Sequence, residues 1–372
     1  MRVAIPTETK NNEFRVAITP SGVHELVAHG HEVVVQAGAG AGSSIPDSEY
    51  AAQGATLLDA AADVWAAGEL VLKVKEPTPA EFGFLRDDLV LFTYLHLAAD
   101  RPQTEALLAA GTTAIAYETV RLPGGMLPLL YPMSEVAGCL APQVGAAALL
   151  APHGGRGVLM GGVGGVRTTK VVILGGGVAG QNAANIAVGM GADVTVLDTD
   201  LDKLRAIFWR FGNKVRQLYS SALTVREEVL TADLVIGTVL VPGAKAPKLV
   251  TNAMVAQMKP GSVLVDVAID QGGCFEDSHP TTHADPTFRV HDSTFYCVAN
   301  MPGAVPHTST YALTNATLPY AVQIADRGWR TGLQANPALA LGLNTHAGRI
   351  TCEGVAEAFG DLPAHPVADA LR

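Results

Sequence analysis

The residues with the clearest chemical meaning lie between Lys170 and Asp198. An apolar run, VVIL, is followed by Gly175, Gly177 and Gly180 in G-x-G-x-x-G spacing. The first glycine allows a tight turn, the second lets a pyrophosphate approach the backbone, and the third lets a helix pack on the strand. Asp198 lies 18 residues beyond Gly180, where an acid can bond a ribose 2′-OH. This order predicts a dinucleotide site rather than a glycine-rich turn without a ligand.

Four side chains outside this pattern have functional groups suited to binding or transforming a small acid. Arg15 lies in a polar loop, where its guanidinium suits a carboxylate unless it is a solvated surface arginine. Lys75 suits a carboxylate or carbonyl oxygen, unless it lies with Lys73 at an exposed sheet edge. His96 ends an apolar strand, so it lies either at a cleft or hydrogen-bonded in the core. Asp270 follows a strand that opens toward a bound cofactor, and otherwise caps a turn.

The elements that would position these residues alternate between strand and helix. This rhythm predicts an α/β fold with two Rossmann-like, doubly wound parallel sheets, and ligands bind such sheets outside the carboxyl ends of the strands. We therefore expect the polar residues at strand ends to converge on a cleft between two domains. The predicted strands are Arg2–Ile5, Glu32–Gln36, Thr56–Leu58, Leu70–Lys75, Leu89–His96, Thr112–Glu118, Val171–Leu174, Val194–Leu197, Asp233–Gly237, Ser262–Ile269 and Tyr296–Ala299.

Helix signals are clearest in three places. Thr19 and the proline after it open a helix that runs to about His29. Ser134 is the expected N-cap of a long apolar helix that Pro142 should bend or locally break. The chain from about Thr308 is mostly helical in pattern.

Composition excludes several classes of protein. A chain of 372 residues is long enough for two domains, and its net charge of −10 disfavours nucleic-acid binding, which needs a basic face. The sequence has neither the pattern of a signal peptide nor an apolar run of the roughly 18 residues that span a bilayer. The four cysteines are scattered without a C-x-x-C pair, which indicates reduced thiols in a cytoplasmic protein and no metal site.

Several longer motifs resemble those of the alanine dehydrogenase and pyridine nucleotide transhydrogenase family. Together they cover nearly the whole chain, and several are far more specific than a glycine fingerprint. They are RVAIPTETKNNEFRVAITPSGV, LKVKEP, FTYLHLA, AYETV, PMSEVAG, LGGGVAG, APKLV, VLVDVAIDQGGCFE and FYCVANMPGAVPHTSTYALTNATLPY.

The resemblance implies an NAD-dependent L-alanine dehydrogenase. Such an enzyme converts L-alanine, NAD and water to pyruvate, ammonium and NADH, and also runs in reverse. The resemblance further implies a substrate domain from residues 1–128 and 307–372, an NAD-binding Rossmann domain from residues 129–306, and a homohexamer. It implies small-molecule substrates, and neither nucleic-acid nor membrane partners.

The resemblance also implies a role for each matching residue. Arg15 and Lys75 match substrate-binding positions, and His96 and Asp270 match the catalytic pair. The expected cofactor-binding residues are Ser134, Gly175, Gly177, Val178, Ala179, Gly180, Asp198, Lys203, Ser220, Val239, Leu240, Val267, Ala268, Ile269, Asp270, Val298, Asn300 and Met301.

Two alternatives remain at this stage. One is another amino- or imino-acid dehydrogenase on the same fold, such as one that forms saccharopine. The other is a nucleotide-binding transhydrogenase subunit, which needs no amino-acid site. The chain departs from the family pattern at Cys139, Pro142, Gln181 and residues 207–218, which bears on helix geometry and cofactor affinity rather than on reaction type.

Overall fold

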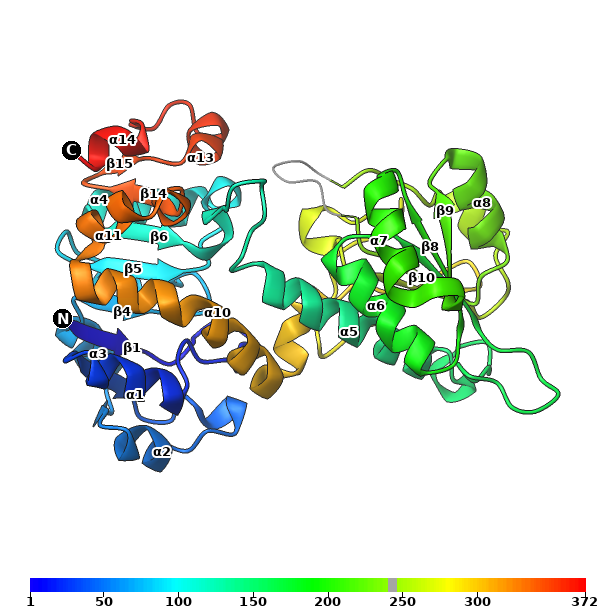
Figure 1. Cartoon of the computed structure of the whole chain (residues 1–372), viewed down its shortest axis with the longest axis horizontal. Helices are drawn as coiled ribbons and strands as arrows, with labels where there is room; N and C mark the ends of the chain where they lie inside the picture. The colour runs from blue at the N-terminus through cyan, green and yellow to red at the C-terminus, as the bar shows by residue number, and fades with distance from the viewer. Residues whose placement is uncertain (240–245) are drawn as a thin grey trace. The chain divides into compact units, whose positions relative to one another are not determined.

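The structure is a computed structural model that describes residues 1–239 and 246–372. The chain divides into two compact units, each with its own sheet (Figure 1). Unit 1 comprises Met1–Met133 and Val305–Arg372, so it is built from both ends of the chain. Unit 2 comprises Ser134–Ala304.

Unit 1 contains an eight-stranded mixed sheet in the order β15-β14-β6-β5-β4-β1-β2-β3. The strands from β6 to β3 are parallel, whereas β14 and β15 are antiparallel to their neighbours. The strand order reverses between β1 and β4, which is where an open α/β sheet binds its ligands. The strands are β1 (Arg2–Ile5), β2 (Glu32–Gln36), β3 (Thr56–Leu58), β4 (Leu70–Leu72), β5 (Val90–Thr93), β6 (Thr113–Ala116), β14 (Leu343–His346) and β15 (Arg349–Ile350).

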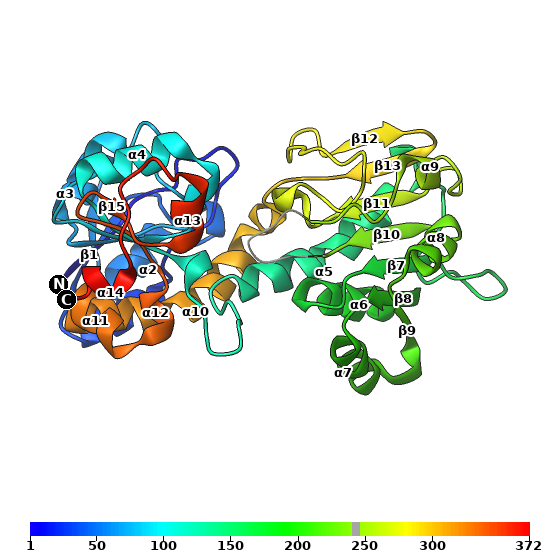
Figure 2. The same cartoon turned by 90° about the horizontal axis from the view of Figure 1, so that it is seen from above.

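Helices of unit 1 begin where side chains satisfy the free N–H groups of the first turn. The Thr19 hydroxyl accepts a hydrogen bond from the Gly22 N–H at the start of α1, and the Asp100 carboxylate does the same for Gln103 in α4. Figure 2 shows the helices of this unit from a second side. They are α1 (Pro20–Ala28), α2 (Asp47–Ala52), α3 (Ala61–Ala67), α4 (Arg101–Ala110), α10 (Pro306–Arg327), α11 (Trp329–Ala335), α12 (Pro337–Ala340), α13 (Glu353–Ala358) and α14 (Val367–Ala370).

Unit 2 contains a seven-stranded sheet in the order β12-β13-β11-β10-β7-β8-β9, parallel except for the edge strand β12. Here the order reverses at β7. Its strands are β7 (Lys170–Leu174), β8 (Asp193–Asp198), β9 (Val215–Tyr219), β10 (Leu234–Gly237), β11 (Val263–Asp266), β12 (Thr287–Val290) and β13 (Ser293–Tyr296). Its helices are α6 (Val178–Gly189), α7 (Leu201–Phe211), α8 (Ala222–Leu230) and α9 (Asn252–Val255), and α5 (Tyr131–Ala148) starts in unit 1 and continues into unit 2.

The central strands of both sheets are buried on both faces, which explains why they are continuous apolar runs rather than alternating patterns. Every residue of Val171–Leu174 is fully buried, as is every residue of β5 except Val90, which is nearly so. Helices therefore cover both faces of each sheet. The expected α/β class with two doubly wound sheets is confirmed, with the correction that both sheets carry antiparallel edge strands that the sequence pattern did not predict.

Several predicted boundaries were wrong. The strands predicted to end at Lys75, His96 and Ile269 end at Leu72, Thr93 and Asp266, because an apolar sequence continues after the ladder of backbone hydrogen bonds stops. The strand predicted over Tyr296–Ala299 is β13, which ends at Tyr296.

The long helix was also misjudged at its start and its middle. It begins at Tyr131, so Ser134 is an interior residue and not the N-cap. The sequence predicted that Pro142 would bend or locally break the helix, and the helix continues through Pro142 without a break. The Gln143 side-chain amide donates to the Cys139 carbonyl beside this proline.

Two glycines of α6 provide a test of how closely this helix packs on β7. A Cβ at Gly180 would lie 1.8 Å from the Gly175 carbonyl oxygen, whereas a Cβ at Gly189 meets nothing within 4 Å. We expect Gly180→Ala to lower the free energy of unfolding by about 1–3 kcal/mol or more, because backbone must move. Gly189→Ala should leave it unchanged or raise it by up to about 1 kcal/mol. Thermal unfolding of both variants measures this, and equal melting temperatures would contradict the packing argument.

Candidate functional site

In unit 1 the predicted site residues Arg15, Lys75 and His96, together with Glu118, follow the carboxyl ends of four neighbouring strands. Arg15 lies in the loop after β1, Lys75 follows β4, His96 follows β5, and Glu118 follows β6. Because these strands are parallel and adjacent, their ends lie along one edge of the sheet. The sheet therefore brings these four positions to a common edge.

Arg15 is a buried residue, 2% exposed, so the alternative of a solvated surface arginine is wrong. Its Nε and Nη2 donate to the two carboxylate oxygens of Glu13 over 2.7 and 2.6 Å, and its Nη1 contacts the Met133 sulfur at 3.0 Å. Burial alone would raise the pKa of Glu13, but the hydrogen bonds from Arg15 and the charge of Lys75 outweigh it and lower this pKa. Glu13 therefore holds the guanidinium in one orientation.

A cavity of about 360 Å³ lies beside this pair, within unit 1. Residues 7–15 supply most of its wall, including Arg15, Glu13 and Glu8, and the loop after β2 supplies the rest. Lys75 and His96 are not among the lining residues. The volume is ample for a small organic molecule. The charged residues of the lining are Arg15, Lys10, Glu8 and Glu13.

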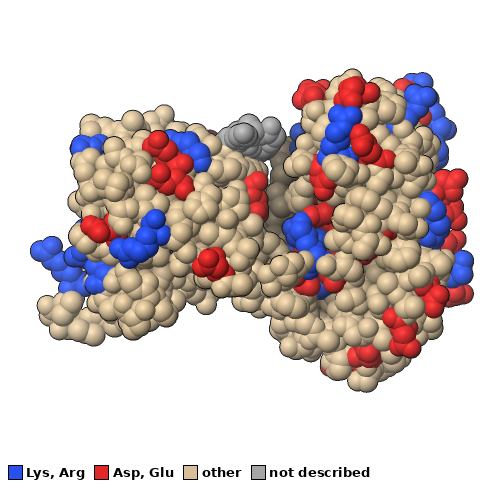
Figure 3. All heavy atoms as spheres, turned by 180° about the vertical axis from the view of Figure 1, so that it is seen from behind, with Lys and Arg blue, Asp and Glu red and all other residues tan. Residues whose placement is uncertain are grey.

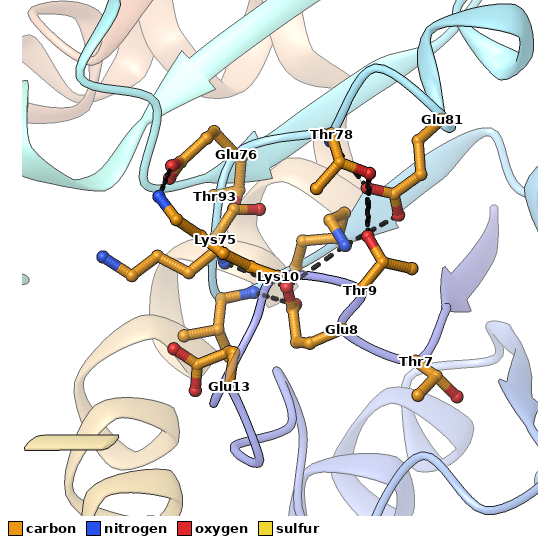
Figure 4. A network of polar contacts seen from close by, with 12 residues as sticks. Thr7, Glu8, Thr9, Lys10, Glu13, Lys75, Glu76, Thr78, Glu81 and Thr93 are labelled. Atoms are coloured by element: carbon orange, nitrogen blue, oxygen red, sulfur yellow. Dashed lines mark hydrogen bonds and ion pairs between the residues drawn. The ribbon is translucent and has the colours of Figure 1, made fainter. Parts of the chain in front are cut away.

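Lys75 is half-buried, and a network of buried charges surrounds Lys73, two residues before it (Figure 4). Lys73 is 0% exposed, and its ammonium lies 3.1 Å from a Glu8 oxygen and 3.0 Å from a Glu81 oxygen. Since β4 lies between β1 and β5, the alternative that both lysines line an exposed sheet edge is wrong. The charge of Lys75 lowers the pKa of Glu76, even though burial of that carboxyl acts in the opposite direction.

His96 is 48% exposed and is not a core histidine, which excludes that alternative. Its backbone lies in the left-handed region with φ of 51°, which costs a non-glycine residue roughly 1–2 kcal/mol. The Glu118 carboxylate offsets this cost because it accepts the His96 N–H at 2.6 Å and the Leu95 N–H at 3.2 Å. The imidazole lies parallel to the Tyr94 ring, 5.8 Å between centroids.

In unit 2 the glycine fingerprint lies at the point where the strand order reverses. Gly175 follows β7 with φ of 107°, and the Thr238 hydroxyl after β10 donates to its carbonyl at 2.9 Å. A Cβ at Gly177 would meet nothing within 4 Å, so the backbone is open to a ligand at the start of α6. This is the geometry that accepts a pyrophosphate.

Asp198 ends β8 beside this turn. Its Oδ2 accepts the Gly176 N–H at 2.6 Å, its Oδ1 accepts the Asp200 N–H at 2.8 Å, and the Lys203 ammonium lies 3.8 Å from Oδ2. The carboxylate is thereby fixed next to the fingerprint. Ser220 lies close by, since its N–H donates to the Asp198 carbonyl at 3.0 Å.

Most other predicted cofactor contacts also lie at carboxyl ends of strands in unit 2. Val239 follows β10, Val267–Asp270 follow β11, and Val298–Met301 follow β13. Val178 and Ala179 begin α6, and Ser134 lies in α5. Leu240 lies outside the described residues.

Asp270 is exposed and lies in a short 3₁₀ helix, Ile269–Gln271. The carboxylate that caps this loop is Asp266, which sequence reasoning missed. Fully buried, Asp266 accepts hydrogen bonds from the N–H groups of Ala268, Cys274 and Phe275 and from the Ser278 hydroxyl. Burial raises its pKa. The sequence signal that could have identified Asp266 is an acidic residue at the end of a strand, shortly before the sequence Asp-Gln-Gly-Gly.

Two departures from the family pattern lie beside the fingerprint. The Gln181 side-chain amide donates to the Gly176 carbonyl at 3.0 Å, and the Arg210 guanidinium lies 3.4 Å from the Gln181 oxygen. The Cys139 sulfur lies 3.9 Å from an Asn182 oxygen. These residues alter the contacts around α6, while the three fingerprint glycines Gly175, Gly177 and Gly180 are all present.

The surface charges, possible metal ligands, long helices and cysteines bear on the other kinds of site and partner considered from the sequence. In the face drawn in Figure 3, acidic and basic side chains are interspersed among broad areas of other residues. Within the described residues no cluster of three or more histidine, cysteine or acidic side chains could hold a metal ion. No helix in that part of the chain is long and apolar enough to cross a bilayer. The four cysteines are free thiols.

Comparisons with known proteins agree over nearly the whole chain. The family model "Alanine dehydrogenase/PNT, N-terminal domain" matches residues 4–137, and "Alanine dehydrogenase/PNT, C-terminal domain" matches residues 141–353. An alanine dehydrogenase of Mycobacterium tuberculosis is 64% identical over 97% of both chains.

Solved structures show the same relationship. An L-alanine dehydrogenase structure is 51% identical, with a TM-score of 0.95 over 97% of this chain and 99% of that one. A transhydrogenase from Sinorhizobium meliloti is 28% identical, with a TM-score of 0.79 over 95% of this chain and 99% of that one. The chain therefore belongs to the alanine dehydrogenase/PNT family, whose members depend on pyridine nucleotides.

Proposed function

We propose that the protein is an NAD-dependent L-alanine dehydrogenase, which oxidatively deaminates L-alanine to pyruvate and ammonium and catalyses the reverse reductive amination. The observation that carries this proposal is the 64% identity to an alanine dehydrogenase over 97% of both chains. The similarity to the transhydrogenase, at 28% identity, is much weaker. A buried arginine beside a cavity in unit 1 is consistent with an amino-acid site, which a transhydrogenase subunit does not need.

Unit 1 would bind the substrate. Arg15 is the proposed partner of the substrate carboxylate, because its guanidinium is already fixed by Glu13 at the wall of the cavity. Lys75 is the proposed partner of the carbonyl oxygen of pyruvate, where a cation stabilises the negative charge that develops during reaction. The negative charge of Glu13 interacts with both Arg15 and Lys75, and so balances part of their positive charge.

Unit 2 would bind NAD through the fingerprint. The open backbone at Gly177 and the N–H groups of α6 suit the pyrophosphate, and Asp198 suits the ribose 2′-OH. The proposed contacts also include Ser134, Gly175, Val178, Ala179, Gly180, Lys203, Ser220, Val239, Leu240, Val267, Ala268, Ile269, Asp270, Val298, Asn300 and Met301. When bound, NAD supplies the acceptor for the hydride that leaves the alanine Cα.

After hydride transfer, the remaining chemistry is hydrolysis of an iminium, which requires proton transfers. Loss of hydride from alanine leaves an iminium, water adds to its carbon, and expulsion of ammonia then gives pyruvate. His96 is the proposed acid–base group that takes the proton from the attacking water, since an imidazole exchanges protons near neutral pH. Asp270, the proposed second catalytic residue, would stabilise the cationic iminium through its carboxylate.

Consumption of NADH in the presence of pyruvate and ammonium tests this function directly. We expect activity from the purified chain without membranes or a second protein, and dependence on both pyruvate and ammonium. Replacing pyruvate with other 2-oxo acids tests the alternative of a different amino-acid dehydrogenase on the same fold. NADH consumption that needs no ammonium, or that is faster with a larger 2-oxo acid, would contradict the proposal.

The same assay with NADPH tests the role of Asp198. The 2′-phosphate of NADPH would bring like charge to this carboxylate, at a cost of several kcal/mol if nothing relieves it. Lys203 lies 3.8 Å from Asp198 and offsets part of this cost. We expect a higher kcat/KM for NADH, and equal values for the two nucleotides would remove Asp198 from the assigned role.

His96→Ala should lower kcat by roughly 10² to 10⁴, the usual contribution of a positioned acid–base group. Asp270→Asn keeps the size of the side chain and one acceptor oxygen, so it should lower kcat while NADH still binds. Steady-state kinetics across pH and NADH titration measure both. Normal turnover in either variant would show that the residue lies outside the catalytic centre.

We propose further that the chain assembles as a homohexamer and acts in the cytoplasm, as the resemblance to the family implies. The described cysteines are free thiols, which agrees with a reducing compartment.

A further inference from the structure

The main chain of Lys75 is held on both sides by buried side chains (Figure 4). On one side the Glu8 carboxylate accepts the Val74 N–H at 2.6 Å and the Lys75 N–H at 3.3 Å. On the other side the Thr93 hydroxyl donates to the Lys75 carbonyl at 2.9 Å. Both peptide groups of Lys75 are therefore bound by side chains from the neighbouring β1 loop and β5.

These side chains continue the hydrogen bonding of the main chain beyond the end of β4. Strand β4 ends at Leu72, and backbone hydrogen bonds to the β5 segment continue only to Val74, whose carbonyl accepts the Tyr94 N–H at 3.2 Å. Glu8, from the loop after β1, and Thr93, from β5, add side-chain hydrogen bonds at Val74 and Lys75. A lysine in an irregular segment would otherwise have a mobile main chain as well as a long mobile side chain.

We propose that Glu8 and Thr93 are positioning residues that direct the Lys75 ammonium toward the substrate. The inference rests on the proposed function, because it assumes that Lys75 binds pyruvate. Lys73 belongs to the same network: burial raises the pKa of Glu8, and the Lys73 ammonium, 3.1 Å away, acts in the opposite direction and favours the charged carboxylate. An ionised carboxylate accepts hydrogen bonds from two N–H groups more strongly than a neutral group does.

Glu81 offers a matched control within the same network. It is the second carboxylate on Lys73, at 3.0 Å, and its side chain is 3% exposed, against 2% for that of Glu8. Its other partners are the Thr78 N–H and the hydroxyls of Thr78 and Thr9. In the described residues it accepts no hydrogen bond from residues 74 and 75. Removing its charge therefore disturbs the buried network without releasing Lys75.

The test compares Glu8→Gln, Thr93→Val and Glu81→Gln by steady-state kinetics in the reductive direction. Glu8→Gln keeps one acceptor oxygen but places an amide N–H₂ where the second acceptor was. We expect it to raise the KM for pyruvate about tenfold, because small displacements of a binding group reduce its effect steeply, while the KM for NADH stays within about twofold. Thr93→Val, which keeps the side-chain volume, should change the same KM in the same direction. Glu81→Gln should lower the melting temperature and leave the KM for pyruvate unchanged.

A double-variant cycle with Lys75→Ala separates positioning from general damage. If Glu8 acts through Lys75, then Glu8→Gln should cause no further loss of kcat/KM for pyruvate in the Lys75→Ala background. If the double variant loses kcat/KM by the product of the two single-variant factors, the proposal is wrong. It is also wrong if Glu81→Gln raises the KM for pyruvate as much as Glu8→Gln does. If Glu8→Gln does not fold, Thr93→Val decides the question in the same cycle.

The outcomes also distinguish this inference from the proposed function. If Lys75→Ala leaves the KM for pyruvate unchanged, the assignment of Lys75 to the substrate is wrong and the inference falls with it. If Lys75→Ala raises this KM but neither Glu8→Gln nor Thr93→Val does, only the inference is wrong.

Discussion

The fully buried ammonium of Lys73 constrains the whole carboxyl edge of unit 1. A cation away from water must keep counter-charges within reach, and Lys73 has Glu8 from the loop after β1 and Glu81 from the segment after β4. Burial alone would lower the pKa of Lys73, but these two carboxylates outweigh burial and raise it. Glu81 also binds the hydroxyl of Thr9, so the two loops are joined to each other. Residues Glu8 and Thr9, at the start of the loop after β1, are therefore joined to the segment after β4 around a buried charge.

Charge pairing extends from this anchor to the proposed substrate groups. Glu13 forms a two-pronged ion pair with Arg15, and both are nearly fully buried. A single guanidinium in this position would be costly without its partner. Because Glu13 binds the Nε and Nη2 side of the guanidinium, the direction from which a substrate carboxylate can approach is restricted. The buried ion pair with Glu13 thus orients the Arg15 guanidinium before any ligand binds.

Much of this could be predicted from the sequence because parallel strands impose simple rules. The apolar run before Gly175 and the acid at Asp198 are local signals, and both lie where the pattern placed them. Lys75, His96 and Asp270 were predicted near strand ends, and each follows a strand closely even though the strands are shorter than expected. Position along a strand is a local property, which a single sequence carries.

The remaining features depend on partners that are distant in the sequence. Whether Arg15 is buried depends on Met133 as well as on Glu13, and composition favours an exposed arginine. The left-handed backbone of His96 is held by Glu118, which follows the neighbouring strand β6. The edge strands β12, β14 and β15 are two to four residues long, too short to give a periodic signal. Tertiary contacts decide these features, and local patterns do not contain them.

The assembly of unit 1 from both chain ends has a consequence for synthesis on the ribosome. Strand β6 pairs with β14, which begins at Leu343, so its outer edge has no partner until nearly the whole polypeptide has been made. Unit 2, Ser134–Ala304, is contiguous and can fold during that interval. The nascent chain therefore carries an open parallel sheet edge for most of its translation, a state prone to pairing with other chains. Premature termination before β14 would leave that edge permanently exposed.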